Sequence, residues 1–499
     1  MYRQKRSYEN TTVKHSISGN SDNIYRDTKA GQEENMKKFD YSLVKDPQYF
    51  CDGRMEAHSD HMYYRSEEER EDEETSYRHS LNGLWKFHYA RNYASTVAGF
   101  EEDSYSCKDW EDIYVPAHIQ MEGYDAPQYA NVQYPWEGHE ELHPGQIPER
   151  FNPVGSYVKY FHVPENMKGK RVFISFQGAE SGLALWLNGT FVGYSEDSFT
   201  PSEFELTEYL KEGENKLAAQ VFKWTASSWC EDQDFFRFSG IYRDVYLYTV
   251  PEVHVYDLQI RSIPDETLKK ASLEIVTKTW GKVKMKLTLS RKGEILLQDE
   301  KALDGEDTCT WEILNPLLWS AEEPNLYDLD MEVYDENGML QEIIPEKVGF
   351  RRFEMKDGIM TLNGKRIVFK GVNRHEFSSV TGRHVSREEL IQDIENGEII
   401  ALSAALPGEF REAGSAEVIS EGEDAIAATA LSPSQYYLDS WTRVYCDEIW
   451  TAANDFLGSG NKTRMGCTYR SVHYIDDTGE EKVSPLYCLK ATQDGLDSM

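Results

Sequence analysis

The sequence lacks any hydrophobic run that approaches the roughly 20 consecutive apolar residues needed to cross a bilayer. Basic residues are also few, since 53 Lys and Arg stand against 87 Asp and Glu and leave a formal net charge of -34. So acidic a chain is a poor partner for nucleic acid or for an anionic membrane surface. The N-terminal segment MYRQKRSYENTT is positively charged but has no apolar stretch behind it, so no secretory signal is expected.

Paired cysteines are also missing from the pattern. The seven cysteines are an odd number, and they are spread from Cys51 to Cys488 without metal-ligand spacing. We therefore expect reduced thiols in a cytoplasmic protein, and neither a disulfide framework nor a metal site built from cysteine.

Aromatic residues are abundant, with 11 Trp, 31 Tyr and 21 Phe that together make up 13% of the chain. Such residues favour half-buried strands, and they also provide surfaces on which sugar rings can stack. At 499 residues the chain is too long for one ordinary core, so two to four domains are expected.

The first half of the chain is predicted to contain a jelly-roll sandwich. Residues 1–36 are polar and lack periodicity, which predicts a disordered extension and makes Met36 an alternative start. Residues 37–250 form short alternating runs separated by turns, as expected for an antiparallel jelly roll with an N-terminal arm. The pair Asn188-Gly189 predicts a hairpin turn, because both residue types tolerate positive φ. Strands are expected at Tyr157–Val163, Arg171–Gln177, Leu183–Leu187 and Lys216–Phe222.

Residues 251–352 are predicted to form a second, immunoglobulin-like sandwich. Strands are expected in HVYDLQIRSI, SLEIVTKTW, KVKMKLTLS and LYDLDMEVYD, at a spacing typical of that fold. This region has no internal pair of cysteines, which excludes the disulfide-bearing version of the fold.

Residues 353–394 read as the first strand and helix of a βα fold. Arg366–Val372 is predicted to be a buried strand, and Ser386 with Glu389 forms a capping box before an apolar helix face. Residues 395–499 do not continue this alternation and stay an unassigned tail. Within this tail, we expect an amphipathic helix around Trp441 and a hairpin over Thr468–Leu489.

The densest group of chemically active residues is Trp229–Asp244, which reads WCEDQDFFRFSGIYRD. Glu231, Asp232 and Asp234 crowd together there, and such acids repel one another unless a cation, an arginine or a ligand hydroxyl offsets them. Carboxylates beside aromatic rings suit a sugar, but a charged loop held by structural arginines explains the same composition.

Two further segments carry candidate residues. Gly371–Glu376 follows the predicted strand, at the end where a barrel has its active site, and His375 there is either a donor to substrate hydroxyls or a structural histidine. A metal site is disfavoured, because adjacent residues at a strand end point apart. Tyr129–Gly138 (YANVQYPWEG) is most simply explained as aromatic packing within a loop.

Seven motifs together resemble family 2 glycoside hydrolases, and most of all bacterial β-galactosidases of the large cytoplasmic type. They are SLNGLWKFHYA, NVQYPWEG, FNPVGSYVKYF, LWLNGTFVGYSEDSFTPSEFEL, EDQDFFRFSGIYRDVYL, VGFRRFE and LNGKRIVFKGVNRHEFSSVTGR, and they occur in the family's order. The resemblance covers about residues 40–394. It implies a jelly roll, an immunoglobulin-like domain and a (β/α)₈ barrel, and retaining hydrolysis of terminal β-D-galactosides such as lactose.

The resemblance also implies roles for three residues of this sequence. Asn131 matches an asparagine that reaches from the first domain into the substrate site. Asp234 matches an aspartate that binds the galactosyl 6-hydroxyl and shares a sodium ion, and His375 matches a histidine that stabilises the transition state. We therefore expect all three side chains on one side of the assembly, with Asp234 near Phe236 in a loop. The family also uses magnesium, for which matching ligands are missing here.

The sequence departs from the family where catalysis takes place. Retaining hydrolysis needs a glutamate acid/base and a glutamate nucleophile, and the family places both on later barrel strands. No Asn-Glu pair follows Ile394, and only about a hundred residues remain where a barrel needs ~250. We therefore expect no catalytic pair in this chain. Two classes stay open. The first is a β-galactosidase whose chain here is incomplete or needs a complementing chain, and its expected partners are a barrel-bearing chain or further copies of itself in a homo-oligomer. The second is a non-catalytic carbohydrate-binding or interaction protein, or a truncated or frame-shifted gene product.

Overall fold

The computed structural model describes residues 38–130, 134–143, 145–231, 235–369 and 377–393, and the backbone of 470–475 and 481–486. The predicted mostly-β class is confirmed, and all assigned strand pairs in this part of the chain are antiparallel. No helix of the described residues is long and apolar enough to cross a membrane.

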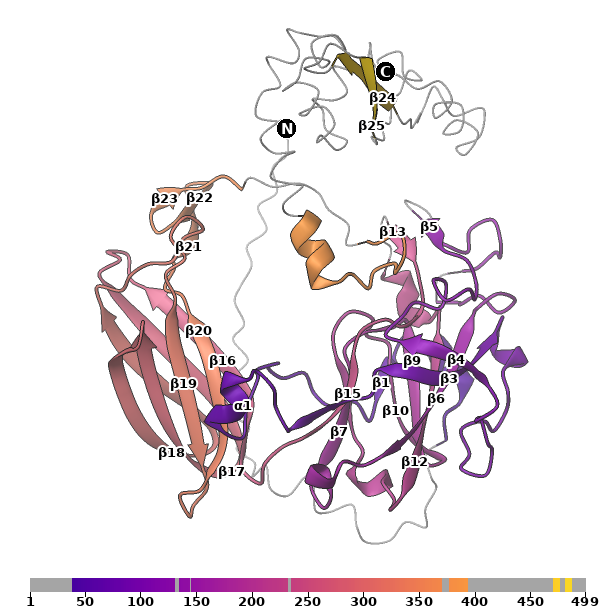
Figure 1. The fold of residues 1–499 in the computed structure, drawn as a ribbon, viewed down its shortest axis with the longest axis horizontal. Coiled ribbons are helices and arrows are strands. Elements are labelled where there is room, and N and C mark those ends of the chain that lie inside the picture. The colour runs from indigo at the N-terminus through magenta and orange to yellow at the C-terminus, as the bar shows by residue number, and fades with distance from the viewer. Residues whose placement is uncertain are drawn as a thin grey trace, which may run out of the picture.

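The first unit is a sandwich of two antiparallel sheets (Figure 1). The larger sheet has the strand order β1 (Cys51–Asp52), β10 (Thr190–Ser195), β9 (Gly182–Leu187), β12 (Glu214–Phe222), β6 (Val154–His162), β3 (Gly83–Ala90) and β4 (Glu111–Val115). The smaller sheet has the order β11 (Ser202–Glu205), β7 (Val172–Phe176), β15 (Val245–Thr249) and β2 (Arg78–Ser80). Two short ribbons join β5 (Gln128–Ala130) to β13 (Phe235–Arg237), and β8 (Ala179–Glu180) to β14 (Gly240–Ile241).

The larger sheet is covered on both faces. Its inner face packs on the smaller sheet through a core that includes Trp85, Leu185 and Ile174. Its outer face is covered by the N-terminal arm and the loop after β3, whose Phe39 and Phe100 pack around Trp186. All six residues of β9 are therefore buried, which explains why this strand is a continuous apolar run and not an alternating one.

The strands predicted in this unit are confirmed within a few residues at each end. The predicted turn is confirmed as well, since Asn188 and Gly189 have φ values of 52° and 83° and join β9 to β10. The acidic run 66–74 contains the short helix α1 (Glu67–Glu71), which buries no residue of its own. Its Arg70 forms an ion pair with Asp330 at 2.6 Å, so this exposed run also contacts the second unit.

The second unit consists of β16 (His254–Pro264), β17 (Lys270–Arg291), β18 (Glu294–Leu314), β19 (Tyr327–Tyr334) and β20 (Leu340–Val348). Two strands predicted at 272–280 and 282–290 are wrong as separate strands, because β17 runs through both. Its first half pairs with β16 and its second half with β19. The pairing register shifts beside Gly281, whose φ of 75° suits glycine and marks the point where the strand changes partner.

Strand β18 is a strand that the sequence pattern does not predict. It pairs with β17 along almost its full length, yet most of its residues are exposed. A strand at the edge of a sheet buries few side chains. Leu303, Cys309 and Ile313 are buried on one face of β18. The charged residues Asp299, Lys301 and Asp307 interrupt the same alternate row and obscure the hydrophobic pattern.

The third unit starts with a small antiparallel sheet of β21 (Phe353–Lys356), β22 (Ile359–Leu362) and β23 (Lys365–Arg366). The buried strand predicted at Arg366–Val372 is wrong in its described part beyond Arg366: Arg366 ends the short, exposed β23, and residues 367–369 form no strand. The helix prediction is confirmed over residues 387–393. Its capping box is also confirmed, because the Glu389 backbone N–H donates to Ser386 Oγ at 3.2 Å and the Ser386 N–H donates to Glu389 Oε2 at 2.8 Å.

In the tail, the predicted hairpin is confirmed as β24 (Arg470–Ile475) paired with β25 (Glu481–Leu486). The expectations for residues 1–36, for the helix around Trp441 and for the remainder of the tail lie outside the described residues.

Candidate functional site

The ribbon of β5 and β13 brings together the neighbours of two predicted site residues. Ala130 pairs with Phe235, and these residues are the direct sequence neighbours of Asn131 and Asp234. Asn131, Asp234 and His375 themselves lie outside the described residues. The described geometry therefore concerns the residues beside them.

An aromatic cluster lies at this ribbon and joins three segments that are distant in sequence. Tyr129 meets Phe236 edge-on at 5.3 Å, and Phe236 stacks on Phe377 at 4.8 Å with an interplanar angle of 12°. These rings come two residues before Asn131, two after Asp234 and two after His375. Because Tyr129 is 53% exposed and Phe377 is 37% exposed, the cluster presents ring surface of the kind on which a sugar can pack.

Arg383 anchors the start of the third unit on the first sandwich. Its guanidinium forms an ion pair with the buried Glu180 and lies over the rings of Phe238 and Tyr242, at 5.7 and 5.6 Å. Burial lowers the pKa of Arg383 to about 10, so the side chain stays charged at neutral pH. An arginine held by a carboxylate and aromatic faces fixes this segment in place.

His118 fills the space between this segment and the sandwich. Its ring stacks on Phe238 at 4.5 Å and on Tyr242 at 4.8 Å. Burial, with the positive charge of Arg383, places the pKa of His118 well below its ordinary value, so the ring is neutral. Gly382 permits the approach, because a Cβ there would lie 2.8 Å from the His118 ring. Sequence analysis assigned no role to either residue: His118 lies outside the seven motifs, and Arg383 is the last residue of the motif LNGKRIVFKGVNRHEFSSVTGR, where it stands apart from the predicted site residue His375.

Glu231 is the described member of the three crowded acids. Ser198 donates a hydrogen bond to its carboxylate at 3.1 Å, and Arg237 Nη1 donates to its backbone carbonyl at 2.5 Å. The pKa of Glu231 is raised to about 7, mainly by burial; the Ser198 hydrogen bond opposes the shift, and the nearby Glu196 adds to it. The hydrogen bond from Arg237 to the Glu231 carbonyl gives this arginine a structural role, as the explanation of the motif as a charged loop held by arginines predicts.

The raised pKa of Glu231 predicts a pH-dependent stability. Its folded-state pKa of about 7 lies above the ordinary 4.5, so the folded state holds the proton more tightly. The protonated carboxyl therefore adds to the free energy of unfolding in full below pH 4.5. This stabilisation is lost as the pH rises through 7, by up to about 3 kcal/mol. We expect Glu231→Gln to be more stable than the wild type at pH 8 and equal to it near pH 4.5, as measured by urea unfolding.

The control for this prediction is Glu214→Gln, which changes an exposed carboxylate that pairs with Lys108. Removing an exposed ion pair changes the unfolding free energy by less than about 1 kcal/mol. A difference between Glu231→Gln and wild type that is the same at both pH values would contradict the assignment.

The segment 129–138 also contains aromatic packing, as its simpler explanation predicts. Trp136 is buried, stacks on Tyr134 at 5.2 Å and meets Trp224 and Trp229 at 5.7 and 4.9 Å. These rings stabilise the loop between the ribbon and the sandwich.

Within the described residues, no group of three or more His, Cys, Asp or Glu side chains is arranged to hold a metal ion. The cysteines of that part, Cys51, Cys107, Cys230 and Cys309, are all free thiols.

The chain matches three family descriptions in succession. Residues 78–251 match the sugar binding domain of glycosyl hydrolases family 2, residues 253–351 match glycosyl hydrolases family 2, and residues 353–403 match the TIM barrel domain of that family. The third match supports the predicted start of a barrel domain after the two sandwiches.

Curated relatives include the β-galactosidase of Halalkalibacterium halodurans, which is 50% identical over 368 residues, or 71% of this chain and 36% of the relative. The β-galactosidase large subunit of Latilactobacillus sakei is 41% identical over 70% of this chain and 58% of its own length. The chain thus spans between about a third and three fifths of the length of these two relatives.

Among solved structures, the β-glucuronidase of Bacteroides uniformis superposes with a TM-score of 0.52 at 22% identity, covering 65% of this chain and 38% of that one. A likeness at this identity shows the shared fold alone. The three successive matches and the 50% identity to a curated relative carry the assignment. Over residues 78–403, the chain belongs to the glycosyl hydrolases of family 2.

Proposed function

We propose that this chain is the galactoside-binding N-terminal portion of a β-galactosidase that hydrolyses terminal β-D-galactosides with retention. The observation that carries the proposal is the aromatic cluster of Tyr129, Phe236 and Phe377. Each ring lies two residues from one of the residues with an expected substrate role, Asn131, Asp234 and His375. The names of the curated β-galactosidases support the choice of galactosides as substrates.

In this proposal, the three residues bind and orient the sugar but do not cleave it. Asp234 accepts a hydrogen bond from the galactosyl 6-hydroxyl, Asn131 bonds a second hydroxyl, and His375 donates to a hydroxyl whose bond strengthens in the transition state. The carbon face of the ring packs on the exposed part of the aromatic cluster. The proton donor and the nucleophile come from later strands of the barrel, outside the residues matched here.

We further propose that a complementing chain supplies those strands. The relatives from Latilactobacillus sakei and Leuconostoc lactis are named large subunits, which supports an enzyme built from more than one kind of chain. The free thiols among the described residues agree with the proposed cytoplasmic location.

Asp234 is the one residue that we propose as a sodium ligand, because hard cations prefer carboxylate oxygens. The described residues beside it form no group of acids and histidines that holds a metal, and they give no support to magnesium. We therefore assign sodium to Asp234 as a prediction and derive no step of the reaction from either ion.

The alternative is a non-catalytic carbohydrate-binding protein that uses the same surface. The observation in its favour is that the exposed rings of Tyr129 and Phe377 suffice for sugar packing without a catalytic carboxylate pair. Turnover after addition of a barrel-bearing chain supports the enzyme, whereas galactose binding without turnover under that condition supports the alternative.

Galactose binding tests the proposed site directly. We expect the wild-type chain to bind D-galactose with a millimolar Kd, because most of a complete pocket is lacking. Asp234→Ala should weaken binding roughly tenfold or more, since it removes a charge-assisted hydrogen bond. The measurement is saturation-transfer NMR, with Glu214→Gln as a control on an exposed acid. Equal affinities of Asp234→Ala and the wild type would refute the assignment of Asp234.

A further inference from the structure

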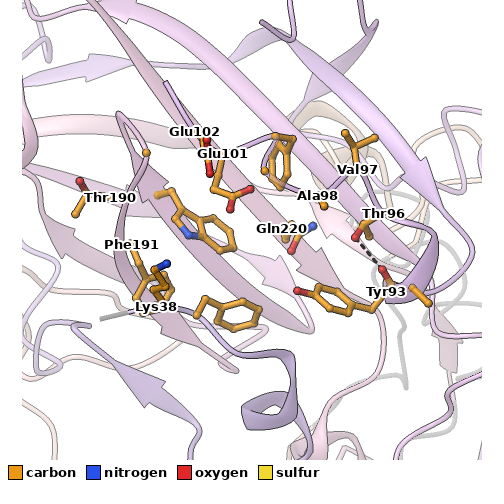
Figure 2. A pocket seen from close by; sticks show the side chains of 16 residues that line it. Lys38, Tyr93, Thr96, Val97, Ala98, Glu101, Glu102, Thr190, Phe191 and Gln220 are labelled. Carbon is orange, nitrogen blue, oxygen red and sulfur yellow. Dashed lines mark hydrogen bonds between the residues drawn. The ribbon is translucent and has the colours of Figure 1, made fainter. Parts of the chain in front are cut away.

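The outer face of the larger sheet carries a cavity of about 510 Å³ that is separate from the candidate site. It lies between the N-terminal arm, the loop around residues 93–102 and the turn that joins β9 to β10 (Figure 2). None of its lining residues belongs to the β5–β13 ribbon or to the third unit. Its volume falls in the range of roughly 300–1,000 Å³ that is typical of small-molecule sites.

The walls of this cavity are aromatic and fixed. Trp186 lines the cavity and packs edge-on against Phe39 at 5.5 Å and Phe191 at 5.7 Å. Tyr93 also lines the cavity and stacks on Tyr41 at 4.1 Å, which holds its ring there. Trp186 and Phe191 are only 6% and 8% exposed, so the half-buried rings of Phe39 and Tyr93 offer more apolar surface to a ligand that carries C–H groups.

Polar groups of two kinds face the same space. Gln220 is 4% exposed, donates to Ser156 Oγ at 3.3 Å, and lies with its amide at the cavity in Figure 2. The carboxylates of Glu101 and Glu102 come from the loop on the other side. A buried amide and nearby carboxylates accept and donate hydrogen bonds in the way that a polyhydroxylated ring requires.

The cavity is built before any ligand arrives. Lys216 is 3% exposed, and its ammonium donates to the backbone carbonyls of Phe100, Glu102 and Tyr105, at 2.6, 2.7 and 2.6 Å. These three bonds fix the loop that carries Glu101 and Glu102 against β12. A preformed site loses little conformational entropy when it binds a ligand.

We propose that this cavity is a second carbohydrate site, which binds a neutral disaccharide. Aromatic walls and buried hydrogen-bonding groups match the two faces of a sugar ring. A neutral sugar is favoured over an anionic one, because Glu101 and Glu102 outnumber Lys38, the basic residue of the lining, and the chain carries a net charge of -34. The site is lined by other residues than the candidate site and does not depend on the proposed function.

Cellobiose is the probe that isolates this site, because it has no terminal galactose. We expect saturation-transfer NMR to show binding in the low-millimolar range by the wild-type chain and by Asp234→Ala alike. Ala98→Trp replaces a small, exposed lining residue by a ring that fills the cavity, and should weaken cellobiose binding roughly tenfold or more. Ala98→Ser is the matched control that changes the same position without filling the space.

The outcomes separate the two proposals. No cellobiose binding by the wild type, or equal binding by Ala98→Trp and Ala98→Ser, overturns the second site and leaves the proposed function untouched. Loss of cellobiose binding in Asp234→Ala also overturns it, because the sugar would then occupy the first site. Galactose titrations repeated with Ala98→Trp report on the first site alone. Glu101→Gln provides a second variant, which should bind cellobiose several-fold more weakly, as expected from losing one charge-assisted hydrogen bond.

Discussion

A purified chain of these 499 residues is expected to show no turnover of nitrophenyl β-galactoside, however well it folds. Retaining hydrolysis requires a proton donor to the leaving oxygen and a nucleophile about 5 Å away on the other side of the anomeric carbon. The proposal assigns Asp234 and His375 to hydroxyl groups, so neither replaces a carboxylate at that carbon. Losing such a group lowers the rate roughly a thousandfold or more.

The assay needs a positive arm and a control. A second chain that carries the later barrel strands should restore turnover when mixed with this chain, and should be inactive alone because it lacks Asn131 and Asp234. Asp234→Ala in the mixture should reduce the restored rate. Turnover by the wild-type chain alone that disappears in Asp234→Ala would contradict the prediction, and Glu448 in the tail would then be the first carboxylate to test.

The second large effect concerns the buried ion pair of Lys223 and Asp125. The two side chains meet at 2.7 Å and are only 1% and 5% exposed, and Gln120 also donates to Asp125 at 2.9 Å. Burial lowers the pKa of Lys223, while Asp125 opposes that shift. Lys223→Met should destabilise the chain by about 3–5 kcal/mol, because it leaves an uncompensated carboxylate in the core. Urea unfolding at pH 7 measures the loss.

Two controls separate pairing from other effects of the substitution. In Lys223→Met/Asp125→Asn the remaining buried group is neutral, so much of the lost stability should return; Asn also tolerates the φ of 56° at that position. Lys108→Met removes the exposed partner of Glu214 and should change the unfolding free energy by less than about 1 kcal/mol. Equal losses in the single and double Lys223 variants would show that the charge pair is not the cause.

The sequence was sufficient to predict features that depend on residues close together in the chain. The Asn188-Gly189 turn and the Ser386–Glu389 capping box follow from residues a few positions apart, and both are confirmed. The same reasoning from local sequence failed at β18, an exposed edge strand in which charged residues interrupt the row of buried side chains. It also failed at Arg366–Val372, where an apolar run predicted a buried strand but residues 367–369 form none.

The sequence by itself determined the family and the β class, because motifs and strand periodicity depend on short segments of chain. The sugar-binding roles of Asn131, Asp234 and His375 stay predictions from the family resemblance. Only the tertiary structure decided which distant residues meet. Phe377 stacks on Phe236, and Arg383 forms an ion pair with Glu180. Lys223 forms an ion pair with Asp125, which lies 98 positions earlier in the sequence. Such contacts depend on how sheets and loops pack, and no local preference of either partner reveals them.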